Sequence, residues 1–532
     1  MLNLKVCARF ASILIFCGSF LTAQVAVTTY QNDNYRSGTN SHETTLTTAN
    51  VNVSHFGRKA VFAVQGQVYA QPLYLPNLTI NGVSHNVVFI ATEHDQVYAF
   101  DVASGQQLWH TNLLISHTAL TTTASISSTD VSCGDMTPEI GITGTPVIDT
   151  TTNIMYFVAL TKETTVVTHQ SAFLQTLHAL DIRTGLDVIS PHQITASAPG
   201  VGTGSLSGTL NFDPLVEGQR PAMLLHPNGQ LIIGWASHCD LGSYHGWLMA
   251  FNKSNLANTA VWVDTPNGVE GGFWASGSGA AADSNGSIYA PTGNGTFDVN
   301  TGGTDYGDSV LRLTWSNGGF TVNDYFTPWD QQNLDNEDGD VASGGVLLLP
   351  DQPGAQYPHL LLQVGKEGTI DLINRDNMGH FHTGNDSQIV QTLPFANNGV
   401  WGSEAFWNNN AYLGPQYGHM QAFSFNPSTQ KLSTSPTSTT TASFNFPGPT
   451  PAVSANGTTN GIVWAIQSDS PGGVATLHAY DATNLATELY NSEQNSSRDR
   501  AGLPVKFVVP TVADGHVFVG VQNQVSMYGL LN

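Results

Sequence analysis

The chain has 532 residues, of which 53 are Gly and only 10% are charged. It carries 39 Asp and Glu against 16 Lys and Arg, a net charge of −23, so nucleic acid and anionic membrane surfaces are poor partners. The length would allow several domains, but all-β barrels and propellers often form one unit of this size. The Gly-rich, weakly charged composition favours many short strands joined by tight turns.

Residues 1–23 have the layout of a secretory signal peptide. Lys5 and Arg9 precede an apolar run that ends in small residues near Ala23, and this run is too short to span a membrane. No later stretch reaches the roughly 18 apolar residues that a spanning helix needs. We therefore expect an exported, monomeric protein without a membrane span, either periplasmic or extracellular.

The cysteines fit an exported chain. Cys7 and Cys17 lie in the signal region, so the mature chain keeps Cys133 and Cys239. Two cysteines in an oxidising compartment most simply form a disulfide bond with each other. Two buried free thiols are the alternative.

One pattern recurs along the chain: an apolar strand, a turn, a second strand, a short polar tip, a third strand that ends in Asp, and a fourth strand. Its clearest copy runs from Gln71 to Trp109. The repeat length, about 40 to 60 residues, is typical of four-stranded propeller blades. The units begin at Gln71, Gly144, Pro221, Gly271, Ser343, Gly399, Pro449 and Phe507.

The last unit has only three strands before the chain ends. The missing strand is predicted at Gly57 to Val64, because closing the ring with strands from both ends removes exposed sheet edges. The sequence therefore predicts an all-β fold, an eight-bladed propeller of four-stranded antiparallel blades. Residues 24–56 would form a lead-in and residues 57–532 a single propeller domain.

Propeller topology predicts where polar residues meet. The connections between blades and the tips between second and third strands lie on the same face of the ring, and this face is the default ligand site. Residues of both kinds therefore converge at one end of the central channel. They include Cys133, Trp274, Asp338 and Asp340 from the connections, and Asp240, Asn294 and Lys366 from the tips.

Two stretches, "VYAFDVASGQQLW" and "LHALDIRTG", resemble the repeat of pyrroloquinoline-quinone (PQQ) propellers. Sharper matches are to the quinoprotein alcohol dehydrogenases. "GGFWASGSGAAADSNGSIYAPTGNG" is similar to a segment in which Trp forms the floor under the quinone and Asn binds the metal, which implies these roles for Trp274 and Asn294. "SHCDLGSYHGWLMAF" is similar to the segment with a metal-binding Glu, and Asp240 falls near that position.

Two further matches complete the implied site. "VGKEGTIDLINRDNMG" resembles the family's Lys-Asn-Gly stretch and places Lys366 at the quinone's carbonyl edge. "TPWDQQNLDNEDGD" resembles the segment with the catalytic base, which implies Asp338 as base and metal ligand and Asp340 as a second ligand. An insertion in this alignment keeps Asp335 as an alternative. These oxygen donors suit a hard cation, calcium or a lanthanide.

The chain departs from the family in three places, one of which is that the Trp that usually ends each repeat is absent from most blades. The adjacent Cys-Cys pair of the family is "CGD" here, so only Cys133 is kept. The family's following Arg, which meets a quinone carboxylate, is replaced so that Glu139 lies nearby. An acid at that place costs binding unless a cation compensates; Lys162 is assigned with Lys366 as a cofactor contact, and Arg498 and Arg500 are further candidates.

Each assignment has a structural alternative. Asn294 precedes Gly and could be only a turn residue. Trp274 could be packing between blades, "DNEDGD" could be a solvated loop, and Lys366 could be a surface charge.

The resemblance implies a metal- and PQQ-dependent dehydrogenase that oxidises an alcohol or sugar. The alternative is a non-catalytic propeller that serves as a protein- or glycan-binding scaffold. A different chemistry that uses the metal end without quinone is a third hypothesis.

Overall fold

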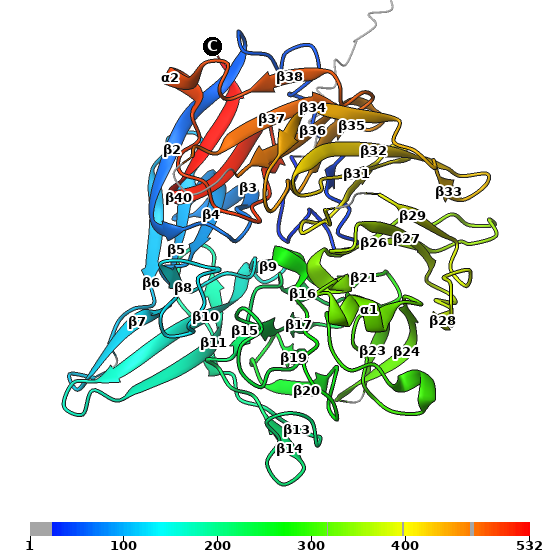
Figure 1. Ribbon diagram of the computed structural model, residues 1–532. Helices are drawn as coiled ribbons and strands as arrows, with labels where there is room; N and C mark the ends of the chain where they lie inside the picture. The colour runs from blue at the N-terminus through cyan, green and yellow to red at the C-terminus, as the bar shows by residue number, and fades with distance from the viewer. Residues whose placement is uncertain (1–23, 117, 317, 396–397, 469–472, 532) are drawn as a thin grey trace, which may run out of the picture.

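The computed structural model describes residues 24–531 apart from 117, 317, 396–397 and 469–472. The expected signal peptide, residues 1–23, lies outside the described residues. The ribbon shows small sheets that radiate from a common centre, with the chain passing around the ring from one sheet to the next (Figure 1). The predicted all-β propeller architecture is confirmed; the count of eight blades stays a prediction.

The sheets of the first half of the ring follow the chain order. They contain β3–β6 (Leu73–Ile80, Val83–Thr92, Gln96–Asp101, Gln107–Asn112) and β7–β12 (Thr121–Ser127, Glu139–Ile140, Val147–Asp149, Ile154–Thr165, Ser171–Asp181, His192–Gln193). Next come β16, β17, β19 and β20 (Leu224–Leu225, Gln230–Gly234, Trp247–Asn252, Asn258–Val263). The sheet of β21–β24 (Ala281–Ala282, Ile288–Pro291, Val310–Ser316, Gly319–Thr327) is extended by β28 (His380–Phe381).

The second half continues in the same way. It contains β25, β26, β27 and β29 (Val346–Leu348, Leu360–Val364, Thr369–Asn374, Gln391–Pro394) and β30–β34 (Ala405–Trp407, Asn410–Leu413, Gly418–Asn426, Lys431–Leu432, Ser438–Phe444). The sheet of β35–β38 (Ala452–Asn456, Thr459–Gln467, Thr476–Asp481, Glu488–Asn491) also holds β1 (Thr39–Asn40).

Smaller elements complete the fold. Two-stranded sheets pair β13 with β14 (Ser197–Pro199, Thr209–Asn211) and β15 with β18 (Glu217–Gly218, Ala236–Ser237). The α-helices are α1 (Gln331–Asn336) and α2 (Ser496–Asp499), and the 3-10 helices are Ala275–Gly277, Val299–Thr301 and Val341–Ser343. No helix among the described residues is long and apolar enough to cross a membrane.

Burial explains why the inner strands are almost continuously apolar. Strands β17 and β26 are buried at every position, because each blade packs against both of its neighbours. The outer strand β6 alternates between half-buried and exposed residues. Strands buried on both faces are mainly apolar, with one Gln each in β17 and β26, whereas the rim strand β6 mixes half-buried and exposed positions.

The ring is closed by strands from both ends of the chain, as predicted. Strand β2 (Phe56–Gln67) pairs antiparallel with β40 (His516–Leu530), in a register that places Phe56 opposite Leu530. Strand β39 (Thr511–Ala513) pairs with the other side of β40. This pairing covers an edge that would otherwise expose unpaired backbone groups.

The lead-in before β2 fills the centre of the ring, where Figure 1 shows it in dark blue. We call residues 27–40 the plug. Its backbone forms hydrogen bonds, with N···O distances of 2.7–2.9 Å, to the backbone of one residue on each of several innermost strands, in the order of the strands around the ring. These residues are Tyr74, Ile148, Ala282, Leu348, Phe406 and Val453, on β3, β9, β21, β25, β30 and β35.

Arg36 anchors the plug. Its side chain is 0% exposed, and its guanidinium donates to Thr29 Oγ1 (2.8 Å), Tyr30 O (3.0 Å), Met223 O (3.2 Å) and Ala280 O (2.9 Å). Burial lowers the pKa of Arg36 to about 10, so the side chain keeps its charge at neutral pH. The guanidinium therefore joins the plug to two blades through oxygens that carry no charge.

We predict that Arg36→Ala lowers the free energy of unfolding by about 2–5 kcal/mol, because truncation leaves a cavity and backbone carbonyls without a donor. Urea denaturation followed by tryptophan fluorescence measures this loss. Arg183→Ala is the control, since Arg183 pairs with Asp181 on the surface and its loss should leave the midpoint unchanged. Equal midpoints for Arg36→Ala and the native protein would contradict the prediction.

Glu404 is buried beside the plug and gives stability a pH dependence. Its side chain is 0% exposed, and neither carboxylate oxygen has a hydrogen-bond partner among the described residues. Burial raises its pKa from 4.5 to about 8. Because the folded state holds the proton more tightly than the unfolded state, this contribution to stability is complete below about pH 4.5 and is lost as the pH rises through 8.

We therefore predict that Glu404→Gln reduces the fall in stability between pH 5 and pH 8. Thermal unfolding at both pH values measures the difference for the native protein and the variant. Other buried acids, such as Glu93 with a pKa raised to about 8, cause part of the dependence of stability on pH, and this part remains in the variant. Glu493→Gln, at a side chain paired with Arg500 on the surface, is the control. The idea fails if Glu404→Gln shows the native slope.

Candidate functional site

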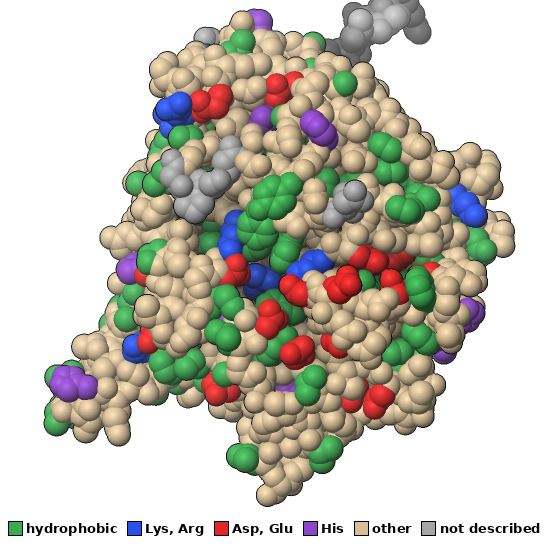
Figure 2. Space-filling view, viewed as in Figure 1, with side chains coloured by type: hydrophobic (Ala, Val, Ile, Leu, Met, Phe, Trp, Pro, Cys, Tyr) green, Lys and Arg blue, Asp and Glu red, His purple; other side chains and the backbone are tan. Residues whose placement is uncertain are grey.

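A cavity of about 190 Å³ lies at one end of the central channel, where blade connections and strand tips meet as predicted. Figure 2 shows Lys and Arg side chains in a hollow of this face, with hydrophobic side chains beside them and Asp and Glu at the rim. The volume is below the roughly 300–1,000 Å³ of common ligand pockets. The lining residues are Trp274, Trp401, Phe446 and Phe507; Arg220 and Lys366; Asp135, Asp240, Asp338 and Asp340; and Ser343 and Cys239.

Lys366 joins two of the predicted acids. It lies at the tip between β26 and β27, and its Nζ pairs with Asp338 Oδ1 and, at 2.6 Å, with Asp340 Oδ2. Burial by itself lowers the pKa of Lys366, but the carboxylates of Asp340 and Asp338 raise it more, so the pKa lies above the ordinary value of a lysine. The ammonium also lies 4.9 Å from the centroid of the Trp401 ring. Lys366 is therefore a component of the cavity and not a free surface charge.

The two acids differ sharply in environment. The Asp338 side chain is 70% exposed and the Asp340 side chain is 8% exposed. Burial raises the pKa of Asp340 above its ordinary value, although Lys366 opposes this shift. Asp338 thus faces incoming solutes, whereas Asp340 is part of the floor.

Asn294 is more than a turn residue. Its backbone N–H donates to Asp340 Oδ1 (2.8 Å), and its amide Nδ2 donates to Asp338 Oδ1 (3.3 Å). Its amide oxygen Oδ1 is buried and has no hydrogen-bond partner among the described residues. A Cβ at the preceding Gly293 would lie 2.4 Å from Asp340 Oδ1 and 2.6 Å from Trp274 Cδ1, so only glycine permits this approach. The result is a free oxygen acceptor beside two carboxylates.

Asp308 and Gln331 hold the two loops of this cluster together. Asp308 Oδ1 accepts from the backbone N–H of Val341, and Asp308 Oδ2 accepts from Gln331 Nε2, both at 3.3 Å. The Asp308 N–H donates to Gly293 O (2.8 Å), and Gln331 also donates to Gly295 O (3.1 Å). Gly293 and Gly295, on both sides of Asn294, are therefore bonded to the Asp308 backbone and to Gln331, while Val341, the residue after Asp340, is bonded to the Asp308 carboxylate.

Trp274 is buried in the cavity wall rather than between outer blade surfaces. Its Nε1 donates to Gly271 O (3.1 Å) and its ring meets Tyr244 edge-on at 5.9 Å. The Arg220 guanidinium lies over the indole at 5.3 Å from the ring centroid. A flat ligand that stacks on this indole has to share it with Arg220. Asp240, beyond Tyr244, accepts from the tyrosine hydroxyl at 2.9 Å.

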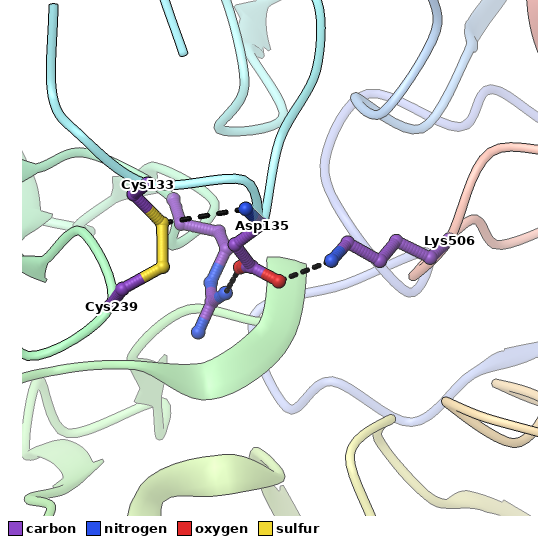
Figure 3. The surroundings of a disulfide bond; sticks show 5 residues. Cys133, Asp135, Cys239 and Lys506 are labelled. Carbon is purple, nitrogen blue, oxygen red and sulfur yellow. Dashed lines mark hydrogen bonds and ion pairs between the residues drawn. A yellow bond between two sulfur atoms is a disulfide. The ribbon is translucent and has the colours of Figure 1, made fainter. Parts of the chain in front are cut away.

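The predicted disulfide is present between Cys133 and Cys239, with a Cα–Cα distance of 5.8 Å and 106 residues between them in sequence. Figure 3 shows the bond next to Asp135. Cys239 itself lines the cavity and directly precedes Asp240. The bond therefore ties a connection between blades to a strand tip of the next blade at the cavity wall.

Other predicted residues do not line the cavity. Lys162 on β10 pairs with Asp130 at 2.5 Å, and Glu139 on β8 contacts His94 Nδ1 at 2.8 Å. Glu139 is thus turned to His94, so the expected conflict between this acid and a ligand in the cavity does not arise. Arg498 and Arg500 pair with Asp499 and Glu493 elsewhere.

Five residues in or next to the cavity wall were not predicted from the sequence: Arg220, Trp401, Phe446, Phe507 and Lys506, which pairs with Asp135. Arg220 lies directly before the strand that begins a repeat, in a connection of the kind predicted to reach this face. In a chain with 16 Lys and Arg, any cation in such a connection was a usable signal. The aromatic residues had no comparable signal, because aromatic side chains occur throughout the blade cores.

Acidic side chains alone do not form a metal site here. No group of three or more His, Cys, Asp or Glu in the described part of the chain is arranged to hold a metal ion. Around Asn294 the oxygen donors are its amide and the carboxylates of Asp338 and Asp340, which still form a hard-oxygen set.

No protein-family model matches the chain, and no curated protein matches it. Several solved structures, however, match the chain over most of its length. The quinohemoprotein alcohol dehydrogenase from Comamonas testosteroni has a TM-score of 0.62 at 15% identity, over 96% of this chain and 81% of that one. A europium-containing methanol dehydrogenase has a TM-score of 0.59 at 11% identity, over 95% of this chain and 98% of its own.

The fold is that of the quinoprotein alcohol dehydrogenases. A second quinohemoprotein alcohol dehydrogenase, ADHIIG from Pseudomonas putida HK5, agrees with a TM-score of 0.59 at 12% identity, over 95% of this chain and 80% of that one. At these identities the likeness concerns the fold, and the chemistry has to be argued from the cavity itself.

We predict that Asp308→Asn loosens the loops of the site. An amide has only one acceptor oxygen, so its NH₂ group would face either the Val341 N–H or Gln331 Nε2, at a cost of about 1–3 kcal/mol. Hydrogen–deuterium exchange should become at least threefold faster in residues 293–295 and 338–342. Asp305→Asn is the matched control, because buried Asp305 accepts from Asn267 N–H (2.9 Å) and contacts neither loop. Unchanged exchange in Asp308→Asn contradicts the prediction.

Proposed function

We propose that the protein is an exported dehydrogenase that oxidises an alcohol or sugar with PQQ and a hard cation, calcium or a lanthanide. The observation that carries the proposal is the free Asn294 amide oxygen, buried beside the carboxylates of Asp338 and Asp340. A structural turn has no need of an unpaired buried acceptor, because such a group costs free energy unless something fills its place.

The donor set suits the proposed cation. Asn294 Oδ1 and carboxylate oxygens of Asp338 and Asp340 are the hard ligands that calcium and lanthanides accept. Asp240 lines the same cavity, and a cation there would also relieve repulsion among the acids. The pKa of nearby Glu270 is raised above its ordinary value. Burial is the largest cause, and the charges of four acids add to it: Asp335, Asp240, Asp340 and Asp338.

The remaining roles follow from burial and charge. When bound, the quinone supplies the two-electron acceptor. The exposed carboxylate of Asp338 takes the proton of the substrate hydroxyl, because it faces the cavity mouth while Asp340 is held in the floor. Lys366 positions both carboxylates with its ammonium, and the Trp274 indole supplies a flat surface for an aromatic ring.

Export is part of the proposal for two reasons. Residues 1–23 have the pattern of a signal peptide, and the Cys133–Cys239 disulfide is of the kind that persists in oxidising compartments. The substrate is proposed to be small, since the cavity has about 190 Å³.

Calorimetric titration of PQQ into the mature protein, with Ca²⁺, with La³⁺ and with chelator, tests the proposal. We expect metal-dependent binding that Asn294→Ala weakens at least tenfold, because the variant lacks the free amide oxygen. Asn285→Ala is the matched control, since Asn285 also precedes Gly but lies exposed in the turn between β21 and β22.

A dye-coupled screen of alcohols and sugars then identifies the substrate. Absence of PQQ binding with every metal would overturn the proposal and leave a propeller that binds a protein or glycan.

A further inference from the structure

The cavity is electrically polarised. At one end, Asp338, Asp340 and Asp240 outnumber Lys366. At the other end, Arg220 Nη1 pairs with Asp135 Oδ2 at 3.3 Å, and Lys506 Nζ pairs with Asp135 Oδ1. Figure 3 shows Lys506 and Asp135 pointing toward each other beside the disulfide. Two cations thus share one carboxylate, and this end carries an excess positive charge.

Aromatic rings hold these cations in place. The Arg220 guanidinium lies 5.3 Å from the ring centroids of both Trp274 and Phe507. Lys506 Nζ lies 5.4 Å from the Phe507 centroid and 5.7 Å from the Phe446 centroid. The rings keep both cations at the cavity and shield them from water.

This arrangement is costly without a second anion. The Arg220 and Lys506 side chains are 12% and 19% exposed, and burial lowers the pKa of Lys506 even though Asp135 opposes the shift. Arg220 and Lys506 in turn hold the pKa of Asp135 below its ordinary value against the effect of burial. Asp135 is therefore ionised and balances one of the two positive charges, while the other has no counterion among the described residues lining the cavity end.

We infer that Arg220 and Lys506 form a binding site for a carboxylate of a flat aromatic ligand whose ring lies against Trp274 and Phe507. In this cavity the ligand's carboxylate end meets the basic end, and its opposite edge meets the acidic end where a cation is proposed. The inference deepens the proposed function and rests on it only in taking PQQ, an aromatic tricarboxylate, as the natural ligand.

The site also accounts for a departure in the sequence. The family's Arg that meets the quinone carboxylate is absent after Cys133. Arg220 and Lys506 come from the connection before β16 and the segment before β39, more than 80 residues from Cys133 in sequence (220 − 133 = 87). The same chemistry is thus supplied from other connections of the ring.

Calorimetry with two probes tests the inference: PQQ with Ca²⁺, and trimesate, an aromatic tricarboxylate without a quinone, in metal-free buffer. We expect Arg220→Gln and Lys506→Gln each to weaken binding of both probes at least tenfold. Lys162→Gln is the matched control, because Lys162 pairs with Asp130, which does not line the cavity, whereas Lys506 pairs with Asp135 in the cavity wall; its effect should stay below twofold. Circular dichroism and thermal unfolding confirm that each variant is folded.

Asp135→Asn separates a ligand site from a structural ion pair. If the cations exist to bind a ligand carboxylate, removing the competing acid should tighten trimesate binding by threefold or more. If the cluster only ties segments together, Asp135→Asn lowers the melting temperature and leaves trimesate binding unchanged or absent, which overturns the inference.

The outcomes for the two proposals are distinct. Metal-dependent PQQ binding that Arg220→Gln and Lys506→Gln leave at native strength overturns the carboxylate site and keeps the proposed function. Trimesate binding that these variants abolish, without any PQQ binding, supports the carboxylate site and overturns the proposed function. Failure of both probes to bind the native protein overturns both.

Discussion

The plug, residues 27–40, is the constraint on which the rest of the architecture depends. A ring of sheets leaves a hole at its centre, and the innermost strands expose backbone groups toward it. The plug satisfies those groups by bonding to one blade after another around the ring, and Arg36 joins it to the carbonyls of Met223 and Ala280. Because buried backbone groups are almost always paired, the ring and its central segment are best understood as one folding unit.

The plug also contacts a connection that lines the cavity. Tyr30, a residue of the plug, lies against Ser403 and near Glu404, which belong to one of the connections that carry the site. A site made of loops is precise only when the loops are held. Here buried Asp308 and Gln331 hold the Asn294 and Asp340 loops, and the disulfide holds the segment that carries Asp240.

The charge distribution gives this cavity its chemical character. The protein is strongly acidic, with few cations, yet Arg220 and Lys366 line one cavity and Lys506 pairs with Asp135 in its wall. Each lies on an aromatic ring and each pairs with at least one carboxylate. Separation of an acidic end from a basic end orients a ligand that carries opposite groups at its two edges, which a uniformly charged pocket cannot do.

Much of this could be predicted from the sequence alone. Strand and turn periodicity determined the propeller class, the closing strand near Gly57 to Val64, and the face on which Trp274, Asn294, Asp338 and Lys366 converge. These features depend on patterns local in the chain and on a topology with few alternatives. The Cys133–Cys239 bond was also predictable, since only two cysteines follow residues 1–23, the expected signal peptide.

Only the tertiary structure decided which side chains touch. It turned Glu139 to His94, paired Lys162 with Asp130, buried Asp340 while leaving Asp338 exposed, and brought Arg220 and Lys506 together on Asp135. It also made the lead-in a plug, although nothing in residues 24–56 resembles a repeat. These outcomes depend on contacts between segments far apart in sequence, whose distances no local pattern encodes.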